Sequence, residues 1–90
     1  MYFKNQTILI TGGAQGIGFS LSKKFSSMGA NVVIADKQKD TPNIAEKFGG
    51  FGYVCDVTKE EELNSFITFA ENKFGGVDCF ISNAGTIFID

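Results

Sequence analysis

The sequence predicts an α/β fold in which a parallel sheet carries helices on both faces. Short apolar runs alternate with segments of helical periodicity in the order strand, helix, strand, helix, strand, helix, strand. This alternation favours parallel strands that are joined by right-handed crossovers. A glycine-rich segment, residues 11–18, separates the first apolar run from the first helical segment, and 43% of the 90 residues are hydrophobic, so the chain can build a core.

The first strand and the first helix lie on either side of the glycine-rich segment. Residues 7–10 form a continuous apolar run, which is typical of a strand buried on both faces. After Gly16 apolar side chains recur at a spacing of three or four residues, which predicts the apolar face of a helix. The members of this face are Ile17, Leu21, Phe25 and Met28. Gly29 stands where a C-terminal helix cap is expected.

The second strand and the second helix are shorter. Residues 31–35 form another apolar run, which is expected to be a buried strand ending at Asp36. Residues 37–41 are polar and predict a loop. Pro42 suits the first turn of a helix, and this helix is expected to run to about Phe48, where a pair of glycines follows.

The rest of the chain predicts a third strand, a third helix and a fourth strand. Residues 51–55 form the third strand, which an internal glycine weakens. Thr58 and Glu61 have the spacing of a capping box, which predicts the start of a helix. An apolar stripe follows at helical spacing and comprises Leu63, Phe66, Ile67, Ala70 and Phe74. After a second glycine pair, residues 77–81 form the fourth strand.

The glycine-rich segment has the context of a phosphate-binding loop, because it follows a buried strand and opens a helix. Gly12 allows a tight turn out of the strand, and Gly16 lets the backbone approach a pyrophosphate without an intervening Cβ. Gly18 permits close packing of the helix on the strand. The free N–H groups at the start of the helix then favour an anion. The alternative is a glycine-rich turn that binds no ligand.

Two acidic residues follow the second and third strands. Asp36 can accept hydrogen bonds from the ribose hydroxyls of an adenosine and would repel the additional phosphate of NADP. Gln15 brings no positive charge to the loop, and Lys37 and Lys39 are flexible point charges, so NAD is preferred over NADP. The alternative for Asp36 is a turn residue at a strand end. For Asp56 two roles are possible: it can contact the adenine amino group, or it can be an ordinary aspartate at a strand end.

Together these residues resemble the short-chain dehydrogenase/reductase family. The resemblance is carried by the TGxxxGxG loop at residues 11–18, by Asp36, by the Asp56-Val57 pair and by the Asn-Ala-Gly motif at residues 83–85. These motifs stand in the family's order and extend across the whole chain. The resemblance implies a Rossmann-type parallel sheet of four strands in the order 3-2-1-4, and NAD as the cofactor.

The resemblance also implies which residues contact the cofactor. Gly12, Gly16, Ile17 and Gly18 would contact the pyrophosphate, with Gln15 in the same loop. Asp36 would contact the ribose, and Asp56 and Val57 the adenine. Asn83, Ala84 and Gly85 would line the part of the cofactor at the sheet centre. In the family, an alcohol/carbonyl substrate exchanges hydride with the nicotinamide. We therefore expect the NAD-binding portion of such an oxidoreductase.

The catalytic residues of the family have no counterpart in this chain. In the family that the chain resembles, the proton is transferred by a Tyr whose acidity is raised by a Lys four residues later. The tyrosines here are Tyr2 and Tyr53, and four residues after them stand Gln6 and Val57. No catalytic residue is therefore assigned, and the chain is expected to be inactive alone. We expect residues 1–90 to be the dinucleotide-binding part of a single Rossmann domain, truncated after the Asn-Ala-Gly motif, with the outer edge of the fourth strand bare.

The sequence is compatible with two other functions. The first is a stand-alone dinucleotide-binding module without catalysis, which can associate through the fourth strand. The second is another Rossmann-type nucleotide binder such as a methyltransferase, which the TGxxxGxG spacing and the Asn-Ala-Gly motif disfavour. Binding of NADH compared with binding of S-adenosylmethionine distinguishes a dehydrogenase from a methyltransferase.

Composition narrows the partners. The net charge of −2 and the scattered lysines argue against nucleic acid. No apolar run is long enough to span a membrane and no signal peptide is evident, so a cytoplasmic protein is expected. Cys55 and Cys79 are expected on the third and fourth strands, which have two other strands between them in the order 3-2-1-4, so no disulfide is expected. Without histidine, no metal site is expected. We expect a small-molecule substrate in the parent enzyme and a homo-oligomer.

Overall fold

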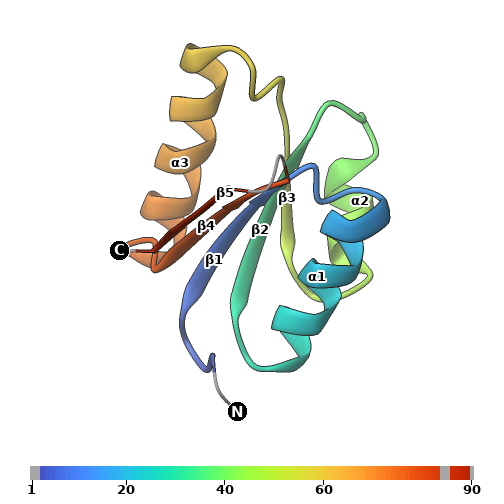
Figure 1. The fold of residues 1–90 in the computed structure, drawn as a ribbon, viewed down its shortest axis with the longest axis vertical. Coiled ribbons are helices and arrows are strands. Elements are labelled where there is room, and N and C mark those ends of the chain that lie inside the picture. The colour runs from blue at the N-terminus through green and yellow to red at the C-terminus, as the bar shows by residue number, and fades with distance from the viewer. Residues whose placement is uncertain (1–2, 84–85, 90) are drawn as a thin grey trace.

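The computed structural model describes residues 3–83 in full and the backbone of residues 86–89. Five strands and three helices follow one another in these residues: β1 (Thr7–Thr11), α1 (Gly16–Ser27), β2 (Asn31–Asp36), α2 (Thr41–Glu46), β3 (Phe51–Val54), α3 (Glu60–Phe74), β4 (Cys79–Ser82) and β5 (Thr86–Ile89). Up to β4 their order is the predicted alternation. Figure 1 shows α3 on one side of the sheet and α1 and α2 on the other.

The sheet has the strand order β3-β2-β1-β4-β5. The first four strands of this order are parallel, with Ile8 of β1 opposite Val32 of β2 and Cys79 of β4. The predicted order 3-2-1-4 is therefore confirmed. Because the strands are parallel, their carboxyl ends meet at one edge of the sheet, where ligands bind in open α/β folds.

Alternate residues of the central strands face the two helical layers, as the side-chain period of a strand requires. On the side of α1 and α2, the buried cluster comprises Ile8, Ile10, Val32, Ile34, Ala45 and Ile81. On the side of α3 it comprises Leu9, Val33, Ala35, Cys55, Phe66 and Ala70. β1 and β2 are thus covered on both faces, and this agrees with their continuous apolar sequences.

The apolar face of α1 differs from the predicted one at its first residue. Ile17 is 74% exposed, whereas Gly18 and Ser22 are the buried residues of this helix. Leu21 and Phe25 pack partly buried against the core, as expected. The difference arises because the first turn of α1 stands at the carboxyl edge of the sheet and packs through Gly18, which turns Ile17 outward.

The start of α3 corrects the predicted capping box. The helix begins at Glu60, with Lys59 at the N-cap, and the Thr58 hydroxyl donates to Oδ1 of Asp56 at 2.6 Å instead of capping the helix. Glu62, rather than Glu61, reaches back, and its Oε1 accepts from the backbone N–H of Asp56 at 2.7 Å. The predicted apolar stripe of this helix is confirmed, with Phe66 and Ala70 fully buried.

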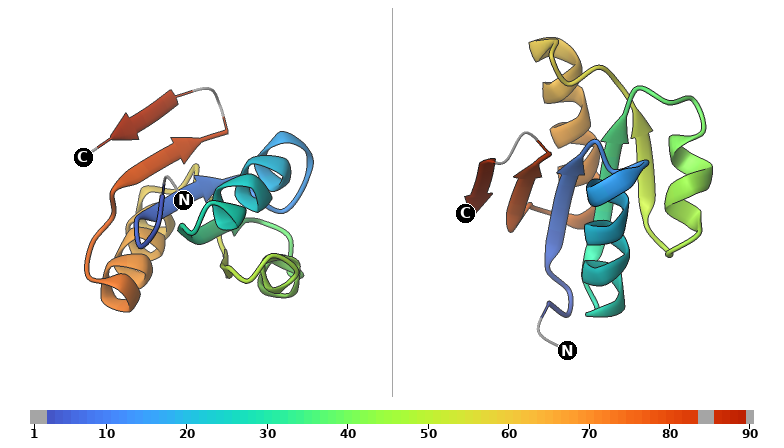
Figure 2. Two further views of the ribbon diagram at one scale, coloured as in Figure 1. Left: turned by 90° about the horizontal axis from the view of Figure 1, so that it is seen from below. Right: turned by 45° about the vertical axis from the view of Figure 1, so that its right-hand side comes forward.

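The outer edge of β4 was expected to be bare, and this expectation is wrong. β5 pairs with β4 in antiparallel register, and Figure 2 shows the two strands side by side at the edge of the sheet. Residues 83–85 alone separate the two strands in the sequence, and a connection of this length permits an antiparallel pair, whereas a parallel strand would need a long crossover. The four parallel strands therefore carry a fifth, antiparallel one.

Two further expectations concern cysteines and membranes. Cys55 follows β3 and Cys79 lies in β4, with β2 and β1 between them, and both cysteines are free thiols. The strand order thus explains why they do not bridge, since a disulfide requires neighbouring Cα atoms. Within residues 3–83 and 86–89, no helix has the length and apolar composition needed to cross a membrane.

Candidate functional site

The glycine loop connects the carboxyl end of β1 to the first turn of α1. Gly12 has a φ of +68° and Gly16 a φ of +59°, a conformation that side-chain-bearing residues rarely adopt. The N–H of Gly12 donates to the carbonyl oxygen of Ala35 at 2.7 Å, which holds the loop against the end of β2. The tight turn predicted at Gly12 is therefore present.

Two glycines allow the loop to fold back on the sheet. A Cβ on Gly18 would lie 2.1 Å from the carbonyl oxygen of Gly12, and a Cβ on Gly13 would lie 2.5 Å from Cβ of Ile34. Both positions therefore require glycine for space. The close packing predicted at Gly18 is present, whereas Gly13 was not singled out in the sequence, because its constraint comes from a side chain on another strand.

The surroundings of Gly16 differ from those of Gly13 and Gly18. A Cβ on Gly16 would meet no atom of the described residues within 4 Å. Gln15, Gly16 and Ile17 are all exposed at the start of α1. The N–H groups of a first helical turn attract anions, and here the approach to them is open.

Asp36 joins the end of β2 to this loop. Its Oδ2 accepts from the N–H of Ala14 at 3.2 Å, and its Oδ1 accepts from the N–H of Gln38 at 3.2 Å. A carboxylate offers about four acceptor positions. Asp36 can therefore hold the glycine loop and still accept hydrogen bonds from the hydroxyls of a ligand.

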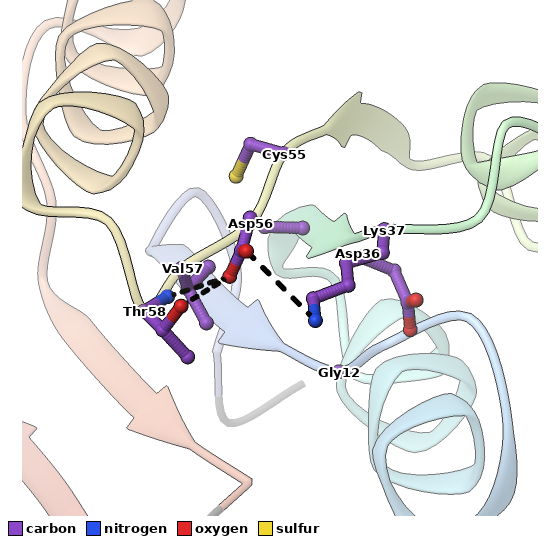
Figure 3. A pocket seen from close by; sticks show the side chains of 8 residues that line it. Gly12, Asp36, Lys37, Cys55, Asp56, Val57 and Thr58 are labelled. Carbon is purple, nitrogen blue, oxygen red and sulfur yellow. Dashed lines mark hydrogen bonds and ion pairs between the residues drawn. The ribbon is translucent and has the colours of Figure 1, made fainter.

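A pocket of about 210 Å³ opens beside Asp36 at the carboxyl ends of β1, β2 and β3. Its lining residues are Gly12, Ala35, Asp36, Lys37, Cys55, Asp56, Val57 and Thr58. Figure 3 shows the labelled lining residues gathered at the strand ends, with the ammonium of Lys37 directed toward the carboxylate of Asp56. The pocket thus brings together four residues of the candidate site, Gly12, Asp36, Asp56 and Val57.

The carboxylate of Asp56 is held by its neighbours in the loop after β3. Oδ1 accepts from both the hydroxyl and the backbone N–H of Thr58, at 2.6 and 3.0 Å. Oδ2 lies 3.8 Å from Nζ of Lys37. These hydrogen bonds from Thr58 lower the pKa of Asp56 below its ordinary value, and Lys37 and Lys59 add to the effect. Asp56 is therefore a carboxylate at neutral pH.

This lowered pKa predicts how stability changes in acid. A depressed folded-state pKa means that Asp56 stabilises the fold above its unfolded pKa of about 3.8 and that this contribution is lost as the pH falls through the folded-state value. We expect the stability difference between the wild type and Asp56→Asn, measured by urea unfolding, to shrink as the pH falls below about 4. Thr58→Val, which removes the strongest donor, should weaken this pH dependence. Identical acid profiles for the wild type and Asp56→Asn would contradict the assignment.

Cys55 contributes a neutral wall to the same pocket. Its side chain is almost fully buried, and burial raises the pKa of the thiol, with further upward contributions from Glu62, Asp56 and Asp36. A raised pKa keeps the thiol protonated at neutral pH, and a protonated buried thiol behaves as a small apolar group. The pocket therefore has an apolar inner wall and a charged rim.

Asn83 approaches the loop from β4. Its backbone N–H donates to Oγ1 of Thr11 at 3.1 Å, and a Cβ on Gly12 would lie 2.8 Å from its Nδ2. Asn83 therefore lies against the glycine loop, on the side of β4 rather than in the pocket. Ala84 and Gly85, the other candidate residues of this motif, lie outside the described residues.

Several lining residues were not among the candidates from the sequence. The sequence indicates Lys37 only as a phosphate ligand and Cys55 only as a buried thiol, yet both residues line the pocket. Thr58 had a signal of its own, because an Asp followed two residues later by a Thr is typical of a turn closed by the Asp side chain. Among the described residues no cluster of His, Cys, Asp and Glu suits a metal ion.

Comparisons with known proteins agree with this geometry. A family model described as short chain dehydrogenase matches residues 6–89. L-fucose dehydrogenase from Bos taurus is 34% identical over 85 residues, which cover 92% of this chain and 32% of the relative. Short-chain dehydrogenase reductase 3b from Arabidopsis thaliana is 42% identical over 84 residues, which cover 89% of this chain and 33% of the relative. The chain spans about a third of the length of these curated relatives.

A solved structure has the same fold. It is a 3-ketoacyl-(acyl-carrier-protein) reductase from Brucella melitensis in complex with NADH. It superposes with a TM-score of 0.80 and 33% sequence identity, and the match covers 83% of this chain and 32% of the reductase chain.

Proposed function

Because the chain belongs to the short-chain dehydrogenase family, we propose that it binds the adenosine half of NAD within an oxidoreductase that transfers hydride between the nicotinamide and an alcohol/carbonyl substrate. The observation that carries this proposal is the pocket at the carboxyl ends of β1, β2 and β3, flanked by the glycine loop and by Asp36. The nicotinamide supplies the hydride chemistry when the cofactor is bound. The solved relative from Brucella melitensis, which holds NADH, supports this choice of cofactor.

The glycine loop suits the pyrophosphate of the cofactor. Gly16 is open to solvent, so that an anion can reach the N–H groups at the start of α1 without a Cβ in its way. Gly12 and Gly18 keep the loop folded beneath this point, and Gln15 and Ile17 lie exposed at its rim. Asn83, Ala84 and Gly85 are proposed to line the part of the cofactor at the sheet centre.

Asp36 suits the ribose, and the pocket suits the adenine. Asp36 has acceptor positions left for ribose hydroxyls, and its negative charge opposes the phosphate of NADP. We therefore favour NAD over NADP. The adenine would enter the pocket beside Val57 and Asp56, with the buried thiol of Cys55 behind it.

We propose that these residues are the cofactor-binding part of the enzyme. The chain contains no Tyr and Lys at the spacing of the family's catalytic pair, so we assign residues 1–90 to the dinucleotide-binding part of one domain. The small-molecule substrate, the homo-oligomer and the cytoplasmic location are proposals that follow from the family. A module that binds a dinucleotide without catalysis is less favoured, because the relatives named above are dehydrogenases and a reductase.

Binding of NADH tests this function. We expect fluorescence titration to detect NADH binding and weaker NADPH binding, and S-adenosylmethionine should not compete. Asp36→Asn removes the negative charge that accepts hydrogen bonds from the ribose hydroxyls, so NADH affinity should fall about tenfold. The ratio of NADH affinity to NADPH affinity should also become smaller. Asp40→Asn is the matched control, since Asp40 is exposed on the following loop and contacts Asn43. Equal affinities of wild type and Asp36→Asn for NADH would refute the ribose assignment.

A further inference from the structure

An ion pair lies across the rim of the pocket. Nζ of Lys37, on the loop after β2, is 3.8 Å from Oδ2 of Asp56, on the loop after β3. Figure 3 shows this pair as a dashed line between the two strand ends. Lys37 directly follows Asp36 in the sequence and lines the same pocket as the residue that we assign to the ribose.

A cation at this position has a consequence for cofactor choice. A basic side chain near the ribose-binding acidic residue is what accommodates the 2′-phosphate of NADP. Lysine can do this as a mobile point charge. Lys37 therefore works against the preference for NAD that Asp36 creates, unless its charge is engaged elsewhere.

We propose that Asp56 is a specificity-determining residue, whose ion pair with Lys37 keeps the ammonium of Lys37 away from a phosphate on the ribose and so disfavours NADP. This inference rests on the proposed function. It gives Asp56 a role in the choice between the two cofactors, separate from any contact with the adenine.

The surroundings of Asp56 fix its carboxylate for this role. Thr58 occupies Oδ1 with two hydrogen bonds, which leaves Oδ2 turned toward Lys37. Oε1 of Glu62 accepts the backbone N–H of Asp56 and anchors the residue, while Oε2 of Glu62 pairs with Lys59 at 3.8 Å. Asp56 is therefore the rigid partner of the pair and Lys37, with 72% of its side chain exposed, is the mobile one.

The size of the effect follows from this exposure. Ion pairs between exposed side chains are weak, because solvent screens them and a long side chain must be ordered. Their measured strengths correspond to about a two- to fivefold change in an equilibrium constant. We therefore expect Asp56 to change the ratio of NADH affinity to NADPH affinity by this factor, whereas Asp36 makes the larger contribution to this ratio.

The test compares NADH and NADPH dissociation constants in the wild type, Asp56→Asn, Lys37→Gln and the double variant. Asparagine keeps the Oδ1 acceptor for Thr58 and removes the charge, so the turn is preserved. We expect Asp56→Asn to raise NADPH affinity relative to NADH by about two- to fivefold. Adding Lys37→Gln to Asp56→Asn should abolish this gain in NADPH affinity. In the wild-type background, Lys37→Gln should change the ratio of NADPH to NADH affinity by a smaller factor than in the Asp56→Asn background.

Glu61→Gln is the matched control, because it removes an exposed carboxylate from the first turn of α3 without touching the Lys37 pair or the hydrogen bond that Glu62 accepts from Asp56, and it should leave the ratio unchanged. If the gain persists in the double variant, or if Glu61→Gln reproduces it, Asp56 acts as a distant charge and the inference is overturned. An unchanged ratio in Asp56→Asn also overturns it while the proposed function stands. Failure of the wild type to bind NADH would overturn both.

Discussion

Replacing Gly18 with alanine should abolish detectable NADH binding and destabilise the fold by about 1–3 kcal/mol. The added Cβ would lie 2.1 Å from the carbonyl oxygen and 2.9 Å from the carbonyl carbon of Gly12. Both are backbone atoms, which cannot rotate away as the end of a flexible side chain can. The loop must therefore leave the helix, and the N–H groups proposed to meet the pyrophosphate move with it.

Two measurements check this prediction. Fluorescence titration follows NADH binding, and urea unfolding gives the free energy of unfolding. Gly76→Ala is the matched control, since a Cβ there would meet no atom of the described residues within 4 Å. Normal NADH affinity in Gly18→Ala would show that the close approach of α1 to Gly12 is not needed for the site.

Replacing Phe66 with alanine should lower the free energy of unfolding by about 3–5 kcal/mol. Phe66 is fully buried between α3 and the sheet. Its ring centroid lies 6.0 Å from that of Tyr53 in β3 and 6.5 Å from that of Phe80 in β4. Alanine would leave a cavity where α3 packs on the sheet, between the side chains that β3 and β4 contribute.

Urea unfolding at neutral pH measures this loss, with the slope of the transition as a check that the unfolded state is unchanged. Phe51→Ala is a suitable comparison, because Phe51 is 40% exposed at the β3 edge of the sheet. It should cost clearly less than Phe66→Ala. Equal losses from the two substitutions would mean that α3 is not held to the sheet through Phe66.

The order of the elements was predictable because it depends on local patterns. Apolar runs and helical periodicity are properties of neighbouring residues, and they located every strand and helix up to β4. The boundaries were less predictable. β4 begins at Cys79 rather than at residue 77, because Asp78 is used to anchor β1: its N–H donates to the Thr7 carbonyl, and its Oδ2 accepts from the Thr7 N–H.

The candidate site was predictable where a backbone conformation or a motif specifies it. Gly12 and Gly16 have the positive φ values that only glycine adopts readily, and Asp36 stands at the end of its strand as expected. The apolar character of Ile17 suggested burial, yet the residue is exposed. Its environment depends on where the helix meets the sheet, which the periodicity of the helix alone does not specify.

The alternation of elements, the glycine loop and the family can thus be inferred from the sequence, because short local patterns and motifs encode them. The partners of the polar groups become apparent only in the folded chain. Asp36 holds Ala14, 22 residues away, and Asn83 meets Thr11, 72 residues away. Asp56 meets Lys37 in the same way. These contacts exist because parallel pairing brings the carboxyl ends of separate strands to one edge, and the register of that pairing depends on the packing of the whole core.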